Sequence, residues 1–598
     1  MSDERPRVAR ADAMLIGGLA LVGLQTVVRI VLVSRGYFWQ DDFVYLSQAR
    51  TDGFSADFIL HDYNDHLQPA QFAIVWLVLE LFGFSYAAAA TTMVVLQVAA
   101  SLALLWVLRR LFGNSVLLLL PFAAYLFTPL GLAPGTWWAA ALQALPLQIF
   151  MLIAIGAASA AIDRGSWRWT LTSCLAFAAG LMFWEKALLI LPAVVGVVVL
   201  VMLRGLKVRQ RWSRLRAAWR LWAGYLVIAA AYLGWYAATI TFNSDQGTAE
   251  ADVGQVLHKV LLQTWLPGLF GGPWSGAGAE NTIAPTPEPA VVVLCAALAA
   301  AVVLGSFVLR GLGALEAWAL LAGYLAVDIA LVVVGRTDYA SFLARDPRYI
   351  IDALPIAVIA VCAAYAPRPA TAADVASETE PRTRWVDRLT ERIDPAILSS
   401  VVLVIVVSGL YTMTQTSGDL RHTYARDYTN NALAAARADP SLVLADSSAP
   451  PTGVVAQPVS VVYSAAGVDV AFDEPTTHLS ILDGFGDPKP VSLISRTFNK
   501  RGPRPDCGWV VDRVPTTIVD LDPVTDRRSI LRIGYVTGDS TTLSIEVGED
   551  HHEVFAPTGF GDAFVPLPAA GGEVRVSVAS GHSPVCVSDL TVGIPWPS

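Results

Sequence analysis

Two adjacent acids, Asp41 and Asp42, follow the first long apolar run of the chain and stand among aromatic residues. Paired carboxylates suit general acid–base chemistry, in which one takes up a proton while the second tunes it, binds a metal or contacts the substrate. The aromatic neighbours would help to exclude water from such a site. The alternative interpretation is a solvated pair of loop acids near a membrane surface. We predict that this pair is catalytic.

A second polar group lies just before Pro69, where histidines alternate with acids. We expect His61, Asp65 and His66 to hydrogen-bond a hydroxylated substrate. Histidines beside acids also suit a divalent metal, with Asp42 and His66 as candidate ligands, but no spacing here matches a strong zinc signature. The metal therefore stays an open alternative, and no other cofactor is predicted. The simplest interpretation is that these polar residues cap a helix that begins at Pro69.

A third group carries positive charge and is suited to an anion. Guanidinium groups bind phosphate through two parallel hydrogen bonds, which makes Arg345 and Arg348, with the adjoining Tyr349, the better phosphate candidates. Lys186 is a further candidate, because an ammonium group binds phosphate as a point charge. The alternatives are an ordinary ion pair at the end of a span for Lys186 and an ordinary charged flank of a span for the arginines.

The composition identifies the scaffold as a membrane protein that crosses the bilayer several times. Hydrophobic residues make up 55% of the 598 residues and charged residues only 15%, compared with about 25% charged residues in a typical soluble domain. The first apolar run has arginines before it and no small-residue cleavage site after it, so we expect a retained anchor. The net charge of -9 argues against a nucleic-acid partner.

Apolar runs long enough to cross a bilayer recur along the first two thirds of the chain. We predict eleven spans, at 13–34, 88–108, 114–132, 139–162, 168–184, 187–203, 220–241, 290–309, 314–335, 349–366 and 396–415. The segment 69–83 is apolar but short and carries Glu80, so we predict a helix that lies on the outer surface, with a twelfth crossing as the alternative.

The positive-inside rule orients these spans. With the N-terminus in the cytoplasm, the arginine-rich loops, including 367–395, are cytoplasmic, and the loops 35–68 and 242–289 are outside. Both acids and the polar groups then gather on the outer face. Trp137, Trp138 and Glu185 reach the same face, so we add them to the expected substrate-binding residues. Separate segments that converge on one face predict one site there.

The composition changes after the last span. Residues 416–440 are typical of an amphipathic connecting helix, and 441–598 hold short alternating runs separated by Gly, Pro and Asp. Strands this short, with a turn about every ten residues, favour a β-sandwich. Cys507 and Cys586 are the cysteines outside the apolar runs, and we expect them to form a disulfide if this domain faces an oxidising compartment.

With these features the chain resembles the GT-C superfamily of membrane glycosyltransferases, which includes protein mannosyltransferases, aminoarabinose transferases and actinobacterial arabinosyltransferases. The resemblance rests on the acidic pair Asp41 and Asp42, the histidine-containing loop before Pro69, the Arg348-Tyr349 pair that opens a late span, and the β-rich tail. It covers the first 100 residues best and the remainder in architecture only.

The resemblance implies an inverting transfer of a sugar from a polyprenyl-phosphate donor to a glycan, lipid or protein acceptor, at the outer face of the cytoplasmic membrane. Asp41 matches the family's base, Asp42 its acidic neighbour, and Arg345 or Arg348 would hold the donor phosphate. The tail is similar to carbohydrate-binding modules of some arabinosyltransferases. The alternatives are a transporter or flippase of lipid-linked sugars, although no internal repeat is visible, and a non-catalytic sugar-binding scaffold.

Overall fold

The computed structural model divides the chain into two compact units, which we describe separately. The membrane unit comprises Met1–Tyr37 and Asp52–Arg421, and the C-terminal unit comprises Phe38–Thr51 and His422–Ser598. The structure describes residues 5–240, 252–272, 286–335, 344–366, 394–446, 454–455, 457–522, 529–567, 571–581 and 584–598. Most of the predicted loop 367–395 and parts of the predicted loop 242–289 lie outside these residues.

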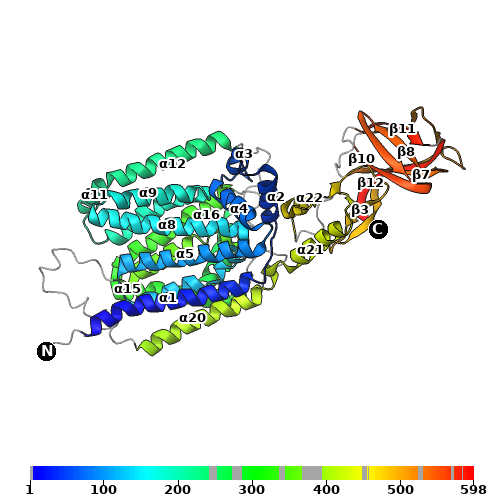
Figure 1. Cartoon of the computed structure of the whole chain (residues 1–598). Helices are drawn as coiled ribbons and strands as arrows, with labels where there is room; N and C mark the ends of the chain where they lie inside the picture. Colours follow the sequence, from blue (N-terminus) through cyan, green and yellow to red (C-terminus); the bar gives the residue numbers. More distant parts are fainter. Residues whose placement is uncertain are drawn as a thin grey trace. The chain divides into compact units, whose positions relative to one another are not determined.

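The membrane unit is built from helices (Figure 1). This is expected, because a helix satisfies its own backbone hydrogen bonds where water is absent. Its helices are α1 (Arg5–Val33), α3 (Ala56–Leu60), α4 (Pro69–Phe82), α5 (Tyr86–Phe112), η1 (Val116–Leu118), α6 (Leu119–Phe127), η2 (Pro129–Gly131), α7 (Ala133–Thr136), α8 (Trp138–Arg164), α9 (Trp167–Leu181), η3 (Glu185–Leu189), α10 (Ile190–Gly196), η4 (Val197–Met202), α11 (Val208–Ala217), α12 (Trp219–Thr239), α13 (Val253–Leu257), η5 (His258–Trp265), α14 (Leu266–Leu269), α15 (Pro289–Arg310), η6 (Gly311–Ala314), α16 (Leu315–Gly335), η7 (Pro347–Tyr349), α18 (Ala353–Tyr365), α20 (Pro395–Thr416) and η8 (Asp419–Arg421).

Seven of the described segments are long and apolar enough to cross a membrane, and Pro289–Val333 among them holds both α15 and α16. Every one of the predicted spans falls on one or more of the helices given above. Helix α4 coincides with the segment predicted to lie on the surface. Its 14 residues extend about 21 Å at 1.5 Å per residue, which is short for a hydrocarbon layer of about 30 Å.

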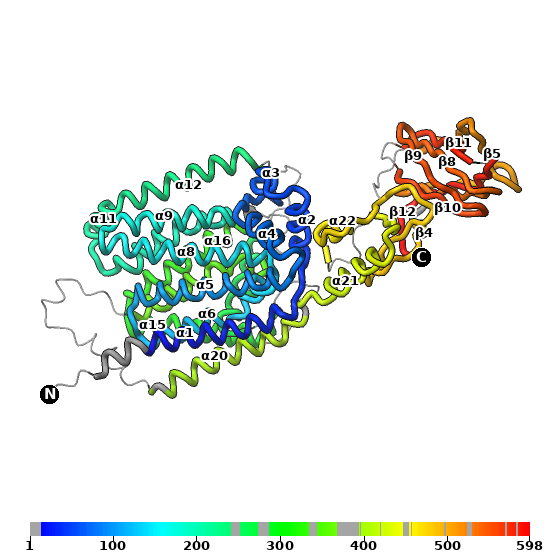
Figure 2. The backbone as a smooth tube through the Cα atoms, in the orientation of Figure 1, coloured from blue at the N-terminus to red at the C-terminus, as the bar shows by residue number. Residues whose placement is uncertain are grey.

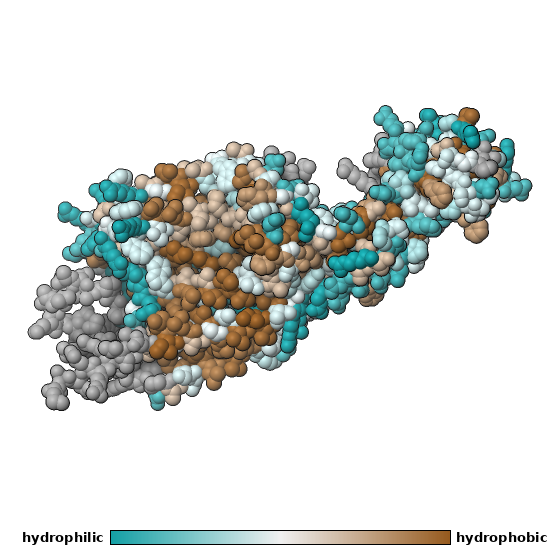
Figure 3. All heavy atoms as spheres, in the orientation of Figure 1, coloured by the Kyte–Doolittle hydropathy of each residue, from teal (hydrophilic) through white to brown (hydrophobic). Residues whose placement is uncertain are grey.

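Helix α8 forms the centre of the membrane unit. Its apolar window is 83% buried, compared with 28% for α1 and 17% for α12, so α8 is surrounded by protein. Helices α1 and α20 run side by side (Figure 2), and Val28 and Met413 share one apolar cluster. Hydrophobic side chains cover the long helices on the face drawn in Figure 3. These features describe a multi-pass membrane fold.

The C-terminal unit holds the helices α2 (Asp41–Asp52), α21 (Thr423–Ala438) and α22 (Ser460–Ala466), and α2 contacts α22. The Oγ atoms of Ser47 and Ser464 lie 2.8 Å apart, and Arg50 donates to the carbonyl of Ala465. Gly467 ends α22 with a φ of +68°, and a Cβ at this position would lie 2.8 Å from the Arg50 guanidinium. The acidic pair therefore belongs by packing to the C-terminal unit, although its position in the sequence places it in the first loop between spans.

The strands of the C-terminal unit form two sheets. One has the order β10-β7-β12-β4-β3-β1-β2, with β5 also paired to β12, and the other has the order β6-β11-β8-β9. The strands are β1 (Val443–Leu444), β2 (Ala471–Phe472), β3 (Leu479–Leu482), β4 (Pro488–Arg501), β5 (Trp509–Val511), β6 (Thr516–Leu521), β7 (Ile530–Thr537), β8 (Thr541–Val547), β9 (Asp550–Ala556), β10 (Gly559–Pro566), β11 (Gly572–Gly581) and β12 (Val585–Pro597). Ile533 of one sheet and Ile545 and Val576 of the other share one buried core, which is the arrangement of a β-sandwich.

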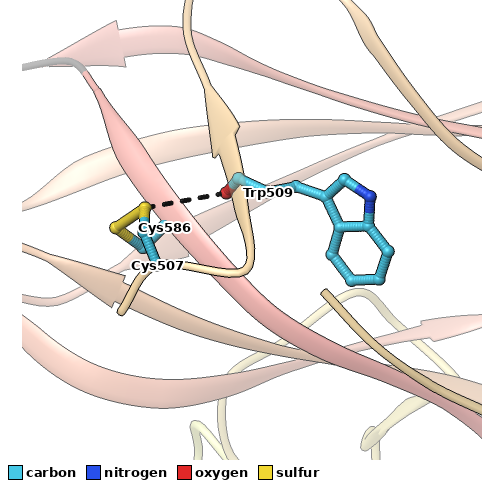
Figure 4. The surroundings of a disulfide bond; sticks show 3 residues. All are labelled: Cys507, Trp509 and Cys586. Atoms are coloured by element: carbon cyan, nitrogen blue, oxygen red, sulfur yellow. Dashed lines mark hydrogen bonds between the residues drawn. A yellow bond between two sulfur atoms is a disulfide. The ribbon is translucent and has the colours of Figure 1, made fainter. Parts of the chain in front are cut away.

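A disulfide joins Cys507, which precedes β5, to Cys586 on β12, and their Cα atoms are 4.8 Å apart. The Trp509 side chain points away from the bridge (Figure 4). The bridge links residues that are 79 positions apart. It therefore restricts a large part of the sandwich sequence in the unfolded chain.

Replacing both cysteines, as in Cys507→Ala with Cys586→Ala, should lower the stability of the sandwich by about 2–4 kcal/mol, because closing a long loop removes entropy from the unfolded state. Thermal unfolding of the full chain and limited proteolysis of the tail would measure the change. The single variant Cys295→Ala, at a buried free thiol of the membrane unit, is the control. If the double variant unfolds at the wild-type temperature and its tail resists proteolysis as well as in wild type, the expectation is contradicted.

Candidate functional site

The acidic pair stands at the start of α2, and its two carboxylates have different surroundings. Asp42 is completely buried, and its Oδ2 accepts the backbone N–H of Trp39 at 3.0 Å. Gln40 has a φ of +48°, which turns the chain sharply into the helix. Negative charge in a first helical turn interacts favourably with the helix dipole. Asp42 is thus buried and bound to the turn before α2, while Asp41, half-buried one residue earlier, is the more accessible carboxylate.

His422 lies beside this turn and was not predicted from the sequence. Its ring stacks on Trp39, with centroids 4.7 Å apart and planes 4° from parallel. His422 has a φ of +50° and is 4% exposed. Burial lowers the pKa of its imidazole to about 4. The ring is therefore neutral near pH 7, and its role in the structure is to pack against the segment that carries Asp41.

In the membrane unit, the structure pairs two predicted residues directly. His66 Nδ1 lies 2.9 Å from Glu185 Oε1. The backbone carbonyl of Asp65 accepts the Tyr236 hydroxyl of α12 at 2.8 Å, which fixes the turn before α4. His61 is placed differently, since its ring stacks on Phe72 with centroids 4.4 Å apart. Of the two histidines, His66 pairs with an acid, and His61 packs in an aromatic cluster. Substrate binding by His61, Asp65, His66 and Glu185 stays a prediction.

Lys186 does not have the contacts expected of a phosphate-binding residue. Its Nζ lies 2.6 Å from Oδ1 of Asp328 and 2.6 Å from Oδ1 of Asp352, and it also donates to the carbonyl of Tyr349. Both aspartates are completely buried, and Lys186 is 7% exposed. Two buried carboxylates already neutralise its charge, so we correct the expectation and remove Lys186 from the phosphate set. The alternative of an ion pair with Glu185 is also replaced, because Glu185 pairs with His66.

Trp138 is likewise a packing residue. It is completely buried, and its Nε1 donates to Thr92 Oγ1 at 2.8 Å. A residue held in this way has no surface for a substrate, so the expectation for Trp138 is corrected as well. Trp137 instead lies against the guanidinium group of Arg348.

Arg348 lies against two aromatic rings. Its guanidinium carbon is 4.5 Å from the centroid of Trp137 and 4.8 Å from that of Tyr349, and its Nε is 2.8 Å from Asp346 Oδ2. Burial raises the pKa of Asp346, and Arg348 partly offsets this effect. Cation–π contacts of this kind hold an arginine in a fixed direction. Lys186 and Arg348 are linked through the backbone of Tyr349, which joins this group to the His66–Glu185 pair.

A second cation, Lys259 on η5, accompanies Arg345 and was missed in the sequence. Partial burial lowers the pKa of Lys259, and the nearby charge of Arg345 lowers it further, with Asp252 acting in the opposite direction. The carbonyl of Ala344 accepts a hydrogen bond from Thr264, which attaches η5 to the Arg345 segment. Two cations in close proximity favour an anionic ligand. The available sequence signal was the position of Lys259 within the predicted outer loop 242–289.

The residues offered as metal ligands do not come together in either unit. Among the described residues, no group of three His, Cys, Asp or Glu side chains is placed to hold an ion. Asp42 accepts the N–H of Trp39 in the C-terminal unit, and His66 pairs with Glu185 in the membrane unit. A divalent metal held by Asp42 and His66 stays a prediction, and we assign no step to it.

Replacing Lys186 tests its role as a structural cation. Lys186→Met would leave two carboxylates buried without a counterion, which typically costs about 3–5 kcal/mol. We therefore expect a much lower unfolding temperature in detergent, largely recovered when Asp328→Asn and Asp352→Asn are added. The exposed Lys207 provides the control variant Lys207→Met. A single Lys186→Met variant as stable as wild type would contradict this role.

The buried His422 predicts a loss of stability in acid. The pKa of His422 is about 4 in the folded chain and about 6.5, the ordinary histidine pKa, in the unfolded chain. Between these two pH values, the unfolded chain binds a proton that the folded chain does not. Stability therefore falls as the pH is lowered through this window, by about 3 kcal/mol in all. Unfolding temperature measured against pH should show a flatter slope for His422→Phe. An identical slope in both proteins would contradict the expectation.

No protein-family model and no curated protein matches the chain. Among solved structures, the chain is similar to apo ArnT from Cupriavidus metallidurans, with 15% identity and a TM-score of 0.43 over 76% of this chain and 85% of that chain. It is also similar to the arabinosyltransferase EmbB from Mycobacterium smegmatis, with 14% identity and a TM-score of 0.34 over 96% of this chain and 64% of that chain. It is similar as well to the mycobacterial arabinofuranosyltransferase AftD, with 12% identity and a TM-score of 0.37 over 96% of this chain and 58% of that chain.

Proposed function

We propose that the chain is an inverting glycosyltransferase that moves a sugar from a polyprenyl-phosphate donor to a hydroxyl of a cell-envelope glycan, lipid or protein. The reaction would take place at the outer face of the cytoplasmic membrane, with the N-terminus in the cytoplasm and the β-sandwich outside. The observation that carries the proposal is the segment with Arg345 and Arg348 directly before the apolar helix α18, with Lys259 within electrostatic range of Arg345.

These cations suit the phosphate of a lipid-linked donor. The segment with Arg345 and Arg348 directly precedes the apolar helix α18. A polyprenyl chain is soluble only in the bilayer, so its phosphate must be met near the ends of membrane helices. Guanidinium groups bind phosphate oxygens in pairs, and an ammonium group adds charge. Undecaprenyl phosphate is the lipid bound in one structure of ArnT, and it belongs to the class of donor lipid proposed here.

Asp41 is the residue we assign as the base. It is the half-buried member of the pair, whereas Asp42 is buried and accepts a hydrogen bond from Trp39. In the proposed step, Asp41 takes the proton of the acceptor hydroxyl while the hydroxyl oxygen attacks the anomeric carbon. The bond from this carbon to the donor phosphate breaks, and its electron pair leaves with polyprenyl phosphate. A single displacement inverts the anomeric carbon, and the cations stabilise the charge of the leaving phosphate.

Substitution of Asp41 tests the proposal. Asp41→Asn should lower kcat by about 10²–10⁴-fold, as expected for the loss of a general base, while donor binding and the unfolding temperature remain near wild type. Turnover of a panel of polyprenyl-phosphate sugars by purified protein is the measurement. Arg345→Gln should raise the donor KM instead, because its role is binding.

Asp57 provides a matched control, since it is an exposed acid on α3 in the same predicted loop. Asp57→Asn should retain full turnover. Donor binding without turnover in the wild-type protein would overturn the catalytic proposal in favour of a transporter or a sugar-binding scaffold. Full turnover by Asp41→Asn would remove Asp41 from the mechanism and leave the activity itself in place.

A further inference from the structure

Helix α11 and the residues on either side of it carry a dense group of cations. Six basic residues and no acid lie between 207 and 220, namely Lys207, Arg209, Arg211, Arg214, Arg216 and Arg220. Arg211 pairs with Glu316 at 2.6 Å, which attaches α11 to the first turn of α16. The other five are exposed, and none of them has an acidic partner among the described residues. This basic segment, residues 207–220, therefore keeps a strong positive potential.

Helix α11 also has an apolar side. Val208, Trp212 and Leu215 are spaced four and then three residues apart, so they lie on one side of the helix. Val208 is 83% exposed and Trp212 is 56% exposed. By the same periodicity Arg209 and Arg216 flank this side, and the guanidinium carbon of Arg216 lies 5.3 Å from the centroid of the Trp212 ring. An exposed apolar side with a basic border suits the boundary between lipid headgroups and acyl chains.

The helix that follows α11 has a parallel neighbour. Cys174 on α9 lies beside Leu221 on α12, with its Sγ 4.0 Å from the carbonyl oxygen. One turn further along both helices, the Phe177 ring stacks on Tyr225, with centroids 4.7 Å apart. The two helices therefore run in the same direction and begin at the same end of the membrane unit, which is the end where α11 lies (Figure 1).

Both of these helices start with the same pair of residue types. The first residue of each is an exposed tryptophan, Trp167 at 64% and Trp219 at 61%. The next residue is an arginine whose guanidinium carbon lies over that ring, at 5.9 Å for Arg168 and 5.7 Å for Arg220. Tryptophan is enriched where membrane helices meet the headgroup layer. The ends of two apolar helices therefore place the basic segment at the level of the membrane surface.

We propose that the basic segment binds anionic phospholipid headgroups of the bilayer that the chain spans, with α11 lying in the plane of the membrane surface. The charge of the segment is complementary to such lipids. Helix α12 enters the apolar layer directly after α11, so the lipid surface is already adjacent. Val208 and Trp212 would then be covered by lipid instead of water. This face is the one predicted to be cytoplasmic, and the inference does not depend on the proposed sugar transfer.

Removal of three cations tests the proposal. The variant with Arg209→Gln, Arg214→Gln and Arg216→Gln is compared with wild type as the purified full chain in neutral detergent. Each cation near an anionic lipid surface contributes about fivefold to binding, so the affinity for phosphatidylglycerol should fall by at least tenfold. The affinity for phosphatidylcholine should not change. Wild type that binds both lipids equally, or a variant that keeps the wild-type preference, would overturn the proposal.

A second triple variant controls for net charge. Arg437→Gln, Arg504→Gln and Arg513→Gln remove three exposed arginines of the C-terminal unit. This control should bind phosphatidylglycerol as wild type does, and salt should weaken that binding because it screens exposed charges. An equal loss of affinity in both triple variants would assign the effect to overall charge and overturn the role of α11.

Two further measurements distinguish a lipid surface from a free anion. Glycerol phosphate has a similar charged group and no acyl chains, so it should not displace phosphatidylglycerol at equal concentration. Trp212→Ser removes apolar surface and no charge, and it should weaken phosphatidylglycerol binding severalfold while the unfolding temperature without lipid stays near wild type. Displacement by glycerol phosphate, or wild-type binding by Trp212→Ser, would overturn the proposal.

Discussion

The ion triad of Lys186, Asp328 and Asp352 is the interaction on which the arrangement of the candidate residues in the membrane unit depends. One ammonium group, buried with two carboxylates, joins η3, α16 and the residue before α18. A charge buried this deeply is tolerated only when it is paired, so the triad admits one arrangement of these helices. Glu185 precedes Lys186 and pairs with His66, and Tyr349, whose carbonyl binds Lys186, follows Arg348. Glu185 and the segment that carries Arg348 are therefore both positioned by this triad.

Local patterns were enough to predict the architecture. Apolar runs located the helices, alternating runs located the sandwich, and the number of cysteines outside the apolar runs located the disulfide. The acidic pair was also visible, because two carboxylates next to a membrane span are unusual in any sequence. What the sequence could not show was that α2 packs against α22, more than 400 positions away, since nothing local records the partner of Ser47.

The distance between partners along the chain also explains the two wrong predictions for the candidate site. Lys186 and Trp138 resembled ligand-binding residues in the sequence because their partners, Asp352 and Thr92, are distant along the chain. Chemical type can be read from a sequence, whereas whether a polar group is satisfied is a property of the folded chain alone.

The packing of α2 has a consequence for the modular organisation of this protein. A tail of short strands after the last membrane helix has the appearance of a detachable accessory module. However, Ser464 and Ala465, which hold α2, belong to that tail, and so does His422, which stacks on Trp39. A gene shortened after the last membrane helix would retain the codons for both acids and lose the protein that folds around them. Recombination that exchanges such tails between relatives would thus have to carry the first loop along with the last third of the chain.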